Sequence, residues 1–423
     1  MAGCARALLL VLVLAAPLAP LAPAAVAQVP PPANEALPGE LLDLGHGWVQ
    51  QLRARTAALA ATGPVNATSP EAFAISADDF VNRSQPTLAM TQVYQGHVAV
   101  AFLEFNRTAP QEREARRAAL LQRIENASRE ATASWDAFLG RLRTLEGSAR
   151  TTHALEYGVM ATLAAIEAEA DAATLADAAE RVRNATAVGD DLVLVTFFGT
   201  EAAPAYFGFA SDLLGLAERA AQDGARPQLQ QGAKEALLAQ VQRRFLLDPD
   251  SASVPGPLAT RAAGQLQAAN RTGPTLLVVA RFLAFEEART RDALGFLLER
   301  GGIDGATLRS LVEGALASPN LVPRYDATFQ DAPSPLPRMR NAGYLGALTG
   351  DARNHAAYRA AEDPSDAGIV RGWTELVVAN FAAEALAEAR AGRGQGLDTN
   401  LVILGGVAVA VALVAIAVGV LRK

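Results

Sequence analysis

Apolar residues recur every three or four positions along most of this 423-residue chain, a spacing that predicts α-helices. Between Pro110 and Leu145 the pattern forms an almost continuous seam of apolar and small residues: Leu121, Ile124, Ser128, Ala131, Trp135, Phe138, Leu142 and Leu145. Alternating β-branched residues, which would indicate strands, are scarce. The pattern therefore predicts an all-α domain with about ten helices between about Leu41 and Arg390.

Proline and glycine residues mark the expected helix boundaries. Proline fits the first turn of a helix, so helices should begin near Pro86, Pro110, Pro204, Pro227 and Pro274. Glycine is expected to end helices at Gly147, Gly224 and Gly301. The turn-forming segment 247–257 is the candidate boundary between two helical lobes, residues 39–247 and 256–391.

Two internal runs, residues 192–217 and 275–285, are apolar enough to suggest membrane spans. Glu201 and Asp212 interrupt the first run, and the second is short and contains Arg281. A charge at the bilayer centre costs about 2.5 kcal/mol or more. We therefore interpret both runs as helices of a protein core.

The strongest membrane signal lies at the C-terminus. Residues 401–421 contain no charge, and a helix of that length would be about as long as the bilayer core is thick. We expect a transmembrane helix over 400–421, a flexible linker over 392–399 and a cytoplasmic tail of residues 422–423. A cleaved sorting signal is the alternative. Small residues four apart would allow the helix to dimerise: Gly406 and Ala410, and Ala415 and Gly419.

An N-terminal signal peptide is expected over residues 1–27. Arg6 precedes nine apolar residues, Leu8–Ala16, and AVA at 25–27 forms an A-x-A cleavage site. A proline-rich linker over 28–38 follows. Signal removal would also remove Cys4, the only cysteine. The mature chain would then have no disulfide, no thiolate metal site and no cysteine nucleophile.

Six of the twelve asparagines lie in the N-glycosylation motif N-x-[S/T], more than chance predicts: Asn66, Asn82, Asn106, Asn126, Asn184 and Asn270. Five flank turn or helix-break signals. Asn126, inside the long predicted helix, should face away from the apolar seam. Because glycosylation requires an exposed exterior site, the motifs predict a glycosylated ectodomain. Together with the missing cysteines and the scarcity of lysine, they are typical of an archaeal surface glycoprotein.

The charge balance limits the possible partners. The whole chain carries −7, and the part outside the signal and the tail carries about −10, with 34 basic and 44 acidic residues. Nucleic acid is not an expected partner, because its affinity comes mainly from cationic contacts to phosphate. The expected partners are the membrane and an extracellular protein or envelope component; nothing beyond the small-residue spacing supports a homodimer.

Two of the four histidines lie three residues from a carboxylate: His46 follows Asp43, and His153 precedes Glu156. Such pairs share a helical face, as metal sites on helices require. The glycines beside His46, however, argue against a regular helix there. No complete di-iron, zinc, nucleotide or hydrolase pattern occurs. The chain therefore predicts no catalytic residue and no cofactor, and its weak metal candidates are His97, His153 and Glu156.

The longest irregular stretch, residues 318–341, has the arginine and aromatic content of a contact surface: Arg324, Tyr325, Phe329, Arg338 and Arg340. Packing over the core is its alternative use. These features together predict a membrane-anchored surface protein with a structural or partner-binding role. The alternative is an extracytoplasmic, metal-dependent enzyme that uses His97 and His153 from adjacent helices. A receptor would need a separate membrane partner, because two cytoplasmic residues cannot carry an output.

Overall fold

The computed structural model describes residues 37–63, 68–226, 228–229, 231–247, 256–299, 301, 304–317, 347–362 and 365–376. Within these ranges the chain forms twelve helices and no β-strand. A further segment, residues 366–376, is also helical. The prediction of an all-α domain is confirmed.

Several expectations lie outside the described residues. These are the signal peptide, the linkers at 28–36 and 392–399, Asn66, Pro227, the contact loop at 318–341, the transmembrane helix at 400–421 and the tail. They stay predictions.

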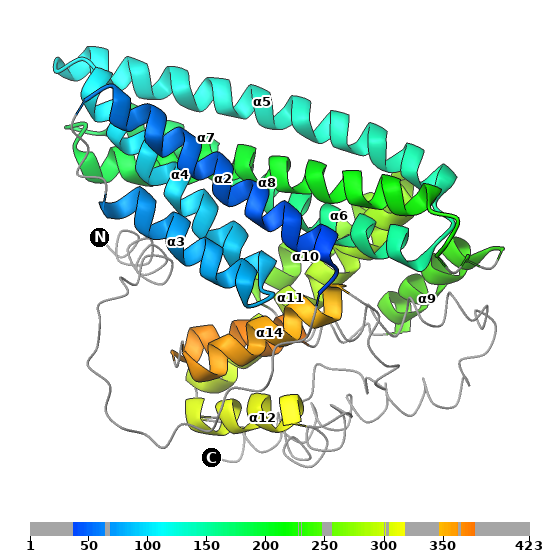
Figure 1. Cartoon of the computed structure of the whole chain (residues 1–423). Helices are drawn as coiled ribbons and strands as arrows, with labels where there is room; N and C mark the ends of the chain where they lie inside the picture. The colour runs from blue at the N-terminus through cyan, green and yellow to red at the C-terminus, as the bar shows by residue number, and fades with distance from the viewer. Residues whose placement is uncertain are drawn as a thin grey trace.

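The first seven helices form one bundle (Figure 1). They are α2 (Gly39–Ala61), α3 (Thr68–Asn82), α4 (Pro86–Thr108), α5 (Arg113–Ser148), α6 (Thr152–Ala173), α7 (Leu175–Asn184) and α8 (Asp190–Gln222). Helices α2, α3 and α4 pack on one another, while α8 lies between α4, α5 and α6. In Figure 1 the long helix α5 runs along the top edge beside α8.

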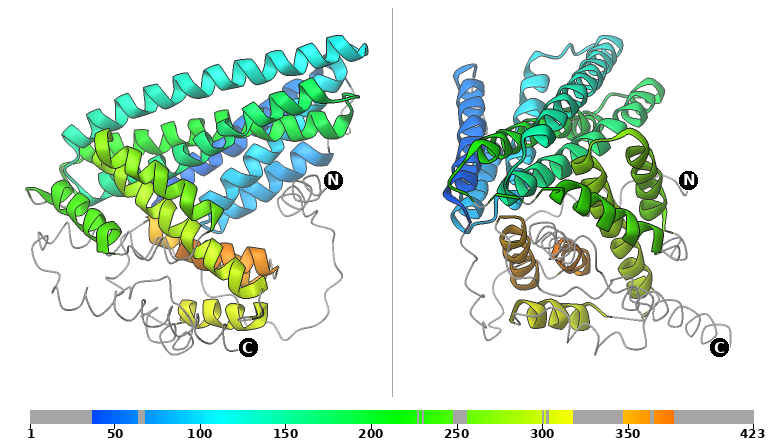
Figure 2. Two further views of the ribbon diagram at one scale, coloured as in Figure 1. Left: turned by 180° about the vertical axis from the view of Figure 1, so that it is seen from behind. Right: turned by 90° about the vertical axis from the view of Figure 1, so that its right-hand side faces the viewer.

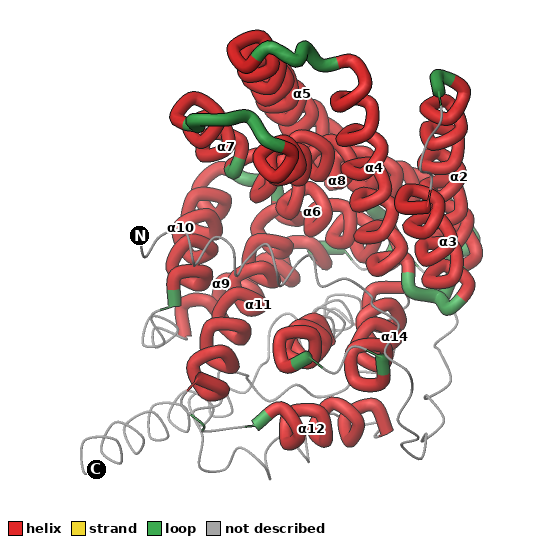
Figure 3. The backbone as a smooth tube through the Cα atoms, turned by 90° about the vertical axis from the view of Figure 1, so that its left-hand side faces the viewer, coloured by secondary structure: helices red, strands yellow, loops and turns green. Residues whose placement is uncertain are grey.

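The remaining helices pack around the lower side of this bundle (Figure 2). They are α9 (Ala233–Leu247), α10 (Pro257–Thr272), α11 (Thr275–Glu299), α12 (Gly305–Ala317) and α14 (Ala347–Ala361). Helices α10 and α11 form a pair, and α11 packs on α6. Helix α14 contacts α4, α6 and α12, and Figure 3 shows α12 lying across the end of the molecule below α14.

Helix α6 is the most enclosed element of the fold. Between Thr152 and Ala168 it is buried at every position except His153, Leu163 and Glu167. Gly158 permits this enclosure, because a Cβ there would lie 2.7 Å from Leu276 Cδ1 of α11. A side chain at this position would force the Leu276 side chain to move, so glycine allows Leu276 to pack directly on α6.

One large hydrophobic cluster connects most of the molecule. It contains Leu41 of α2, Leu213 of α8, Leu276 of α11 and Trp373 of the last helical segment, so it crosses the candidate boundary between the two lobes. A smaller cluster fills the space where α4, α5, α7 and α8 meet, around Phe105 and Phe197. The division into two lobes stays a prediction, and the packing across it is continuous.

The helix boundaries correct part of the sequence interpretation. Pro86 begins α4 and Pro274 directly precedes α11, as predicted. Pro204, in contrast, lies inside α8, which continues from Asp190 to Gln222. Apolar packing on both sides of the proline outweighs the one backbone hydrogen bond that it removes. The prediction of a helix start at Pro204 is wrong.

The seam of α5 is confirmed in its second half and shifted in its first. Ile124, Ala131, Phe138, Leu142 and Leu145 are buried as predicted. In the first turns, however, the buried residues are Leu120 and Ala127, while Leu121 is partly exposed and Ser128 is exposed. Seven-residue spacing and the 3.6-residue turn drift apart along a long helix, so a strict heptad misplaces one end.

Helix α8 is the one described helix that is long and apolar enough, by length and composition, to cross a membrane. Half of its most apolar window is buried by other parts of the chain. Its charged residues have protein partners: Glu201 pairs with Arg55 and Arg123, and Asp212 accepts a hydrogen bond from Trp48 Nε1 at 2.8 Å. These contacts support the interpretation of α8 as a core helix.

Candidate functional site

The four histidines have four separate sets of partners. His46 Nδ1 lies 3.2 Å from Asp78 Oδ1, and His97 Nδ1 lies 3.3 Å from Arg55 Nη1. His153 lies beside Tyr157 at the start of α6, while His355 contacts Glu375. In the described ranges no group of three or more histidine, cysteine or acidic side chains is arranged to hold a metal ion. His97 and His153 therefore do not form one site.

Asp43 and His46 lie on the same helix, α2, but His46 faces α3 and pairs with Asp78. The expected irregularity around His46 is wrong, since α2 continues unbroken through both neighbouring glycines. Gly45 allows close packing there: a Cβ would lie 2.8 Å from Val81 Cγ2. The other weak candidate, Glu156, is buried in α6 with only 1% of its surface exposed.

His97 belongs to an ion-pair network that joins α2, α4, α5 and α8. Arg55 donates to Glu201 at 2.7 Å and to Glu104 at 3.0 Å, and Arg123 forms the second ion pair of Glu201. Burial and the nearby Arg55 charge lower the pKa of His97 to about 4. The imidazole is therefore neutral at pH 7, and the network ties four helices together.

The asparagines of the glycosylation motifs lie at the surface wherever they are described. Asn82, Asn126, Asn184 and Asn270 are exposed, and Asn106 is partly exposed. The prediction that Asn126 faces away from the seam of α5 is confirmed, since it lies on the opposite side from the buried Ile124.

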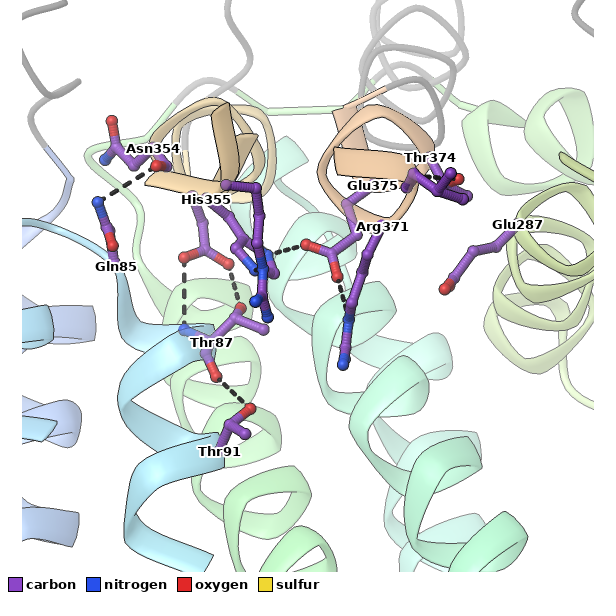
Figure 4. Close-up of polar contacts among 12 residues, drawn as sticks. Gln85, Thr87, Thr91, Glu287, Asn354, His355, Arg371, Thr374 and Glu375 are labelled. Carbon is purple, nitrogen blue, oxygen red and sulfur yellow. Dashed lines mark hydrogen bonds and ion pairs between the residues drawn. The ribbon is translucent and has the colours of Figure 1, made fainter. Parts of the chain in front are cut away.

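A polar junction connects the bundle to the C-terminal helices (Figure 4). At the start of α4, the Thr87 hydroxyl and backbone N–H both donate to Asp351 of α14. Gln85 Nε2 donates to the Asn354 carbonyl at 3.2 Å, and Asn354 Nδ2 donates to the Ser84 carbonyl. Burial raises the pKa of Asp351 to about 6, although the two hydrogen bonds from Thr87 oppose the shift.

The next layer of the junction contains His355, Glu375 and Arg371. His355 Nδ1 contacts Glu375, and its Nε2 accepts a hydrogen bond from Arg359 Nε at 3.0 Å. Burial, with Arg359 and Arg371 nearby, lowers the pKa of His355 well below its usual value. Arg371 Nε donates to Glu375 at 2.9 Å. Figure 4 shows Arg371 directed down between the helices, with Glu287 of α11 turned toward it.

Near its C-terminal end, α6 carries two acids one turn apart, Glu167 and Asp171, which we call the α6 carboxyl pair. Glu167 is exposed and Asp171 is partly exposed. Burial and the neighbouring Glu167 raise the pKa of Asp171 to about 8. A carboxyl group whose pKa is raised and that still reaches solvent is a candidate functional group.

Two tyrosines complete this region. Tyr94 of α4 and Tyr206 of α8 lie with ring centroids 5.5 Å apart. Burial and the charge of Asp171 raise the pKa of Tyr94 to about 12, and burial and the neighbouring Tyr94 raise that of Tyr206. Tyr94, Glu167, Asp171 and Tyr206 are together called the tyrosine–carboxyl site.

Sequence reasoning missed this site. The available signal was the run of acids Glu167, Glu169 and Asp171 in the otherwise apolar, alanine-rich sequence of α6. Tyr94, Tyr206 and Arg371 come from other helices, and no spacing along the chain connects them to α6.

In comparisons with known proteins, no family model, no curated protein and no solved structure matches this chain. Its function is therefore inferred from its own residues.

Proposed function

We propose that this chain is a membrane-anchored, N-glycosylated cell-surface protein whose helical domain binds an extracellular ligand or partner. The signal peptide over 1–27 directs export, and the uncharged segment over 400–421 anchors the chain in the membrane. The helical domain then lies outside the cell.

The observation that carries this proposal is the surface position of the asparagines in the glycosylation motifs. None of the five described asparagines is buried. A sugar at any of them would project into solvent, which glycosylation requires.

The separation of the histidines favours a binding role over the alternative enzyme. That alternative required His97 and His153 to act together, yet His97 lies against Arg55 and His153 lies beside Tyr157.

The experiment expresses the full chain and a version that stops before Asn400 in an N-glycosylating host. We expect the full chain to stay with membranes after alkaline carbonate extraction and the shortened chain to be secreted. Mass spectrometry should find Gln28 at the mature N-terminus and sugar on the motif asparagines. Release of the full chain by carbonate, or its recovery with residues 1–27 attached and no sugar, would overturn the proposal.

A further inference from the structure

The glycosylation motif N-x-[S/T] contains an asparagine and a hydroxyl residue two positions later, so an enzyme that recognises the motif must contact both side chains. In an extended segment, side chains two positions apart point to the same side. In an α-helix they are rotated by about 200° from one another and point in different directions. The motif can therefore be recognised in an extended backbone but not within an intact helix.

The motif at Asn126 lies in the middle of a long helix. Asn126 and Ser128 are both helical, and α5 continues for several turns on either side of them. The residue between them, Ala127, is buried in the smaller hydrophobic cluster. The amide oxygen of Asn126 accepts hydrogen bonds from Gln122 at 3.0 Å and from Arg129 at 2.7 Å. The middle of α5 would have to unfold before this motif could become extended.

The motif at Asn184 has the opposite arrangement. Asn184 is the last residue of α7, and the next residue, Ala185, is extended, with φ −67° and ψ 133°. Asn184 and Thr186 are both exposed, and Thr186 lies in the connection between α7 and α8. The Ala185 carbonyl accepts hydrogen bonds from Arg113 and Arg117 of α5, so the backbone is held in place while both motif side chains stay exposed. The folded domain already presents this motif to an enzyme.

The other three described motifs lie at helix ends. Asn106 and Asn270 belong to the last turns of α4 and α10. Their amide oxygens accept hydrogen bonds from Arg116 at 2.6 Å and from Gln242 at 2.7 Å, respectively. Asn82 ends α3, and the turn that follows it belongs to the polar junction. Terminal turns open more easily than the middle of a helix, so these motifs are intermediate between the other two.

We propose that the fold divides the glycosylation motifs by the time at which they can be modified: Asn126 receives its sugar only before α5 is packed, whereas Asn184 remains an acceptor in the folded domain. This inference rests on the proposed N-glycosylation and adds the order of modification and folding. The sugar comes from an oligosaccharide linked to a lipid phosphate. Asparagine Nδ2 bonds to the anomeric carbon, the bond from that carbon to the phosphate oxygen breaks, and the lipid phosphate leaves with the electron pair. A base of the transferase takes the proton that Nδ2 loses.

Modification of Asn126 therefore competes with the packing of α5. An isolated helix is only marginally stable in water, so the middle of α5 opens often until other helices pack on it. The main helix on α5 is α8, which is synthesised after α5, α6 and α7. A newly made chain thus has a period in which Asn126 can be modified, and this period ends when α8 packs.

The test uses the full chain made in a host without N-glycosylation, then folded and purified in detergent. It is incubated with an oligosaccharyltransferase and a lipid-linked oligosaccharide, and glycopeptide mass spectrometry follows the sugar at each asparagine over time. We expect Asn184 to be modified about tenfold or more faster than Asn126, because the middle of α5 opens rarely once it is packed. Synthetic peptides of residues 121–131 and 179–189 are the unfolded reference, and they should be modified at similar rates.

The substitution Ser128→Thr provides a matched comparison. Alanine follows both Asn126 and Asn184, so this variant gives the two motifs the same sequence, Asn-Ala-Thr. Ser128 is exposed, and the substitution should leave the fold unchanged. In the folded variant, Asn126 should still be modified about tenfold or more slowly than Asn184. The variant peptide of residues 121–131 should be modified as fast as the peptide that contains Asn184.

Three results would overturn the inference. The first is equal modification of Asn126 and Asn184 in the folded Ser128→Thr chain. The second is a difference between the two peptides as large as that in the folded chain. The third is no modification of Asn184 in the folded chain although its peptide is modified. None of these results would affect the carbonate extraction or the glycan analysis of protein from cells, so failure of this inference is distinguishable from failure of the proposed function.

Discussion

Helices α8 and α6 both carry carboxylates within apolar sequence, but the surroundings of these carboxylates differ. Glu201 of α8 is 12% exposed and lies between Arg55 and Arg123, with both of its oxygens paired. Among the described residues, Glu167 and Asp171 of α6 have no such partner, but Glu167 is exposed and Asp171 is partly exposed. An acid removed from water needs a partner and can hold helices together when it has one, whereas an acid that keeps contact with water does not need one.

The largest expected effect is at Glu201. Glu201→Gln would leave Arg55 and Arg123 without their shared acid, and we expect a loss of about 2–3 kcal/mol in the free energy of unfolding. This loss is smaller than that expected for a fully buried ion pair, because the guanidinium groups of Arg55 and Arg123 remain partly exposed. Urea denaturation measures the loss. Glu218→Gln on the same helix removes a half-exposed partner of Arg141 and should cost less than about 1 kcal/mol. Equal costs would refute the structural role of the Glu201 network.

Asp171→Asn, in contrast, should increase the free energy of unfolding. Folding raises the pKa of Asp171 from 3.8 to about 8, so the stability that this group contributes is present below pH 3.8 and is lost as the pH rises through 8. The variant should therefore match the wild type near pH 4 and become more stable above it, by about 2 kcal/mol at pH 8 and beyond. This figure is reduced for partial exposure. Urea titrations at several pH values test it, and a variant less stable than the wild type at pH 8 would contradict it.

His97→Gln should leave the free energy of unfolding unchanged at pH 7.5 and raise it in acid. Folding lowers the pKa of His97 from 6.5 to about 4, so its contribution is present above pH 6.5 and is lost as the pH falls toward 4. Glutamine can still accept the hydrogen bond from Arg55 but does not titrate. At pH 5 the variant should exceed the wild type by about 1 kcal/mol, a figure discounted for partial exposure. If the variant and the wild type differed in stability by the same amount at pH 7.5 and at pH 5, burial of the imidazole would not be the cause of the difference.

The smallest effect is expected at the surface. Asn126→Gln removes an exposed acceptor on α5 and should change the free energy of unfolding by less than about 0.5 kcal/mol. In a glycosylating host, the variant should lose the mass of one glycan. An unchanged mass would remove Asn126 from the proposed set of occupied sites.

Helical periodicity predicted the fold class well, because the buried face of each helix is encoded locally. The prediction placed α5 within three residues at each end. The buried residues of α8 and α11 support the interpretation of both runs as core helices. It failed at Pro204, where packing on both sides keeps α8 continuous, and at Leu121 and Ser128, where the helical repeat departs from seven residues.

The candidate site was less predictable, for a physical reason. Histidines attracted attention because their side chains bind metals, yet His97 and His355 are neutral groups within structural networks. The surroundings of Glu167 and Asp171 follow only from how other helices, chiefly α8 and α11, pack on α6.

The most direct test of the proposed function is alkaline carbonate extraction of membranes from cells that express the full chain. If residues 400–421 anchor the chain, it should stay with the membranes, and a version that stops before Asn400 should be secreted. Release of the full chain by carbonate would contradict the proposal.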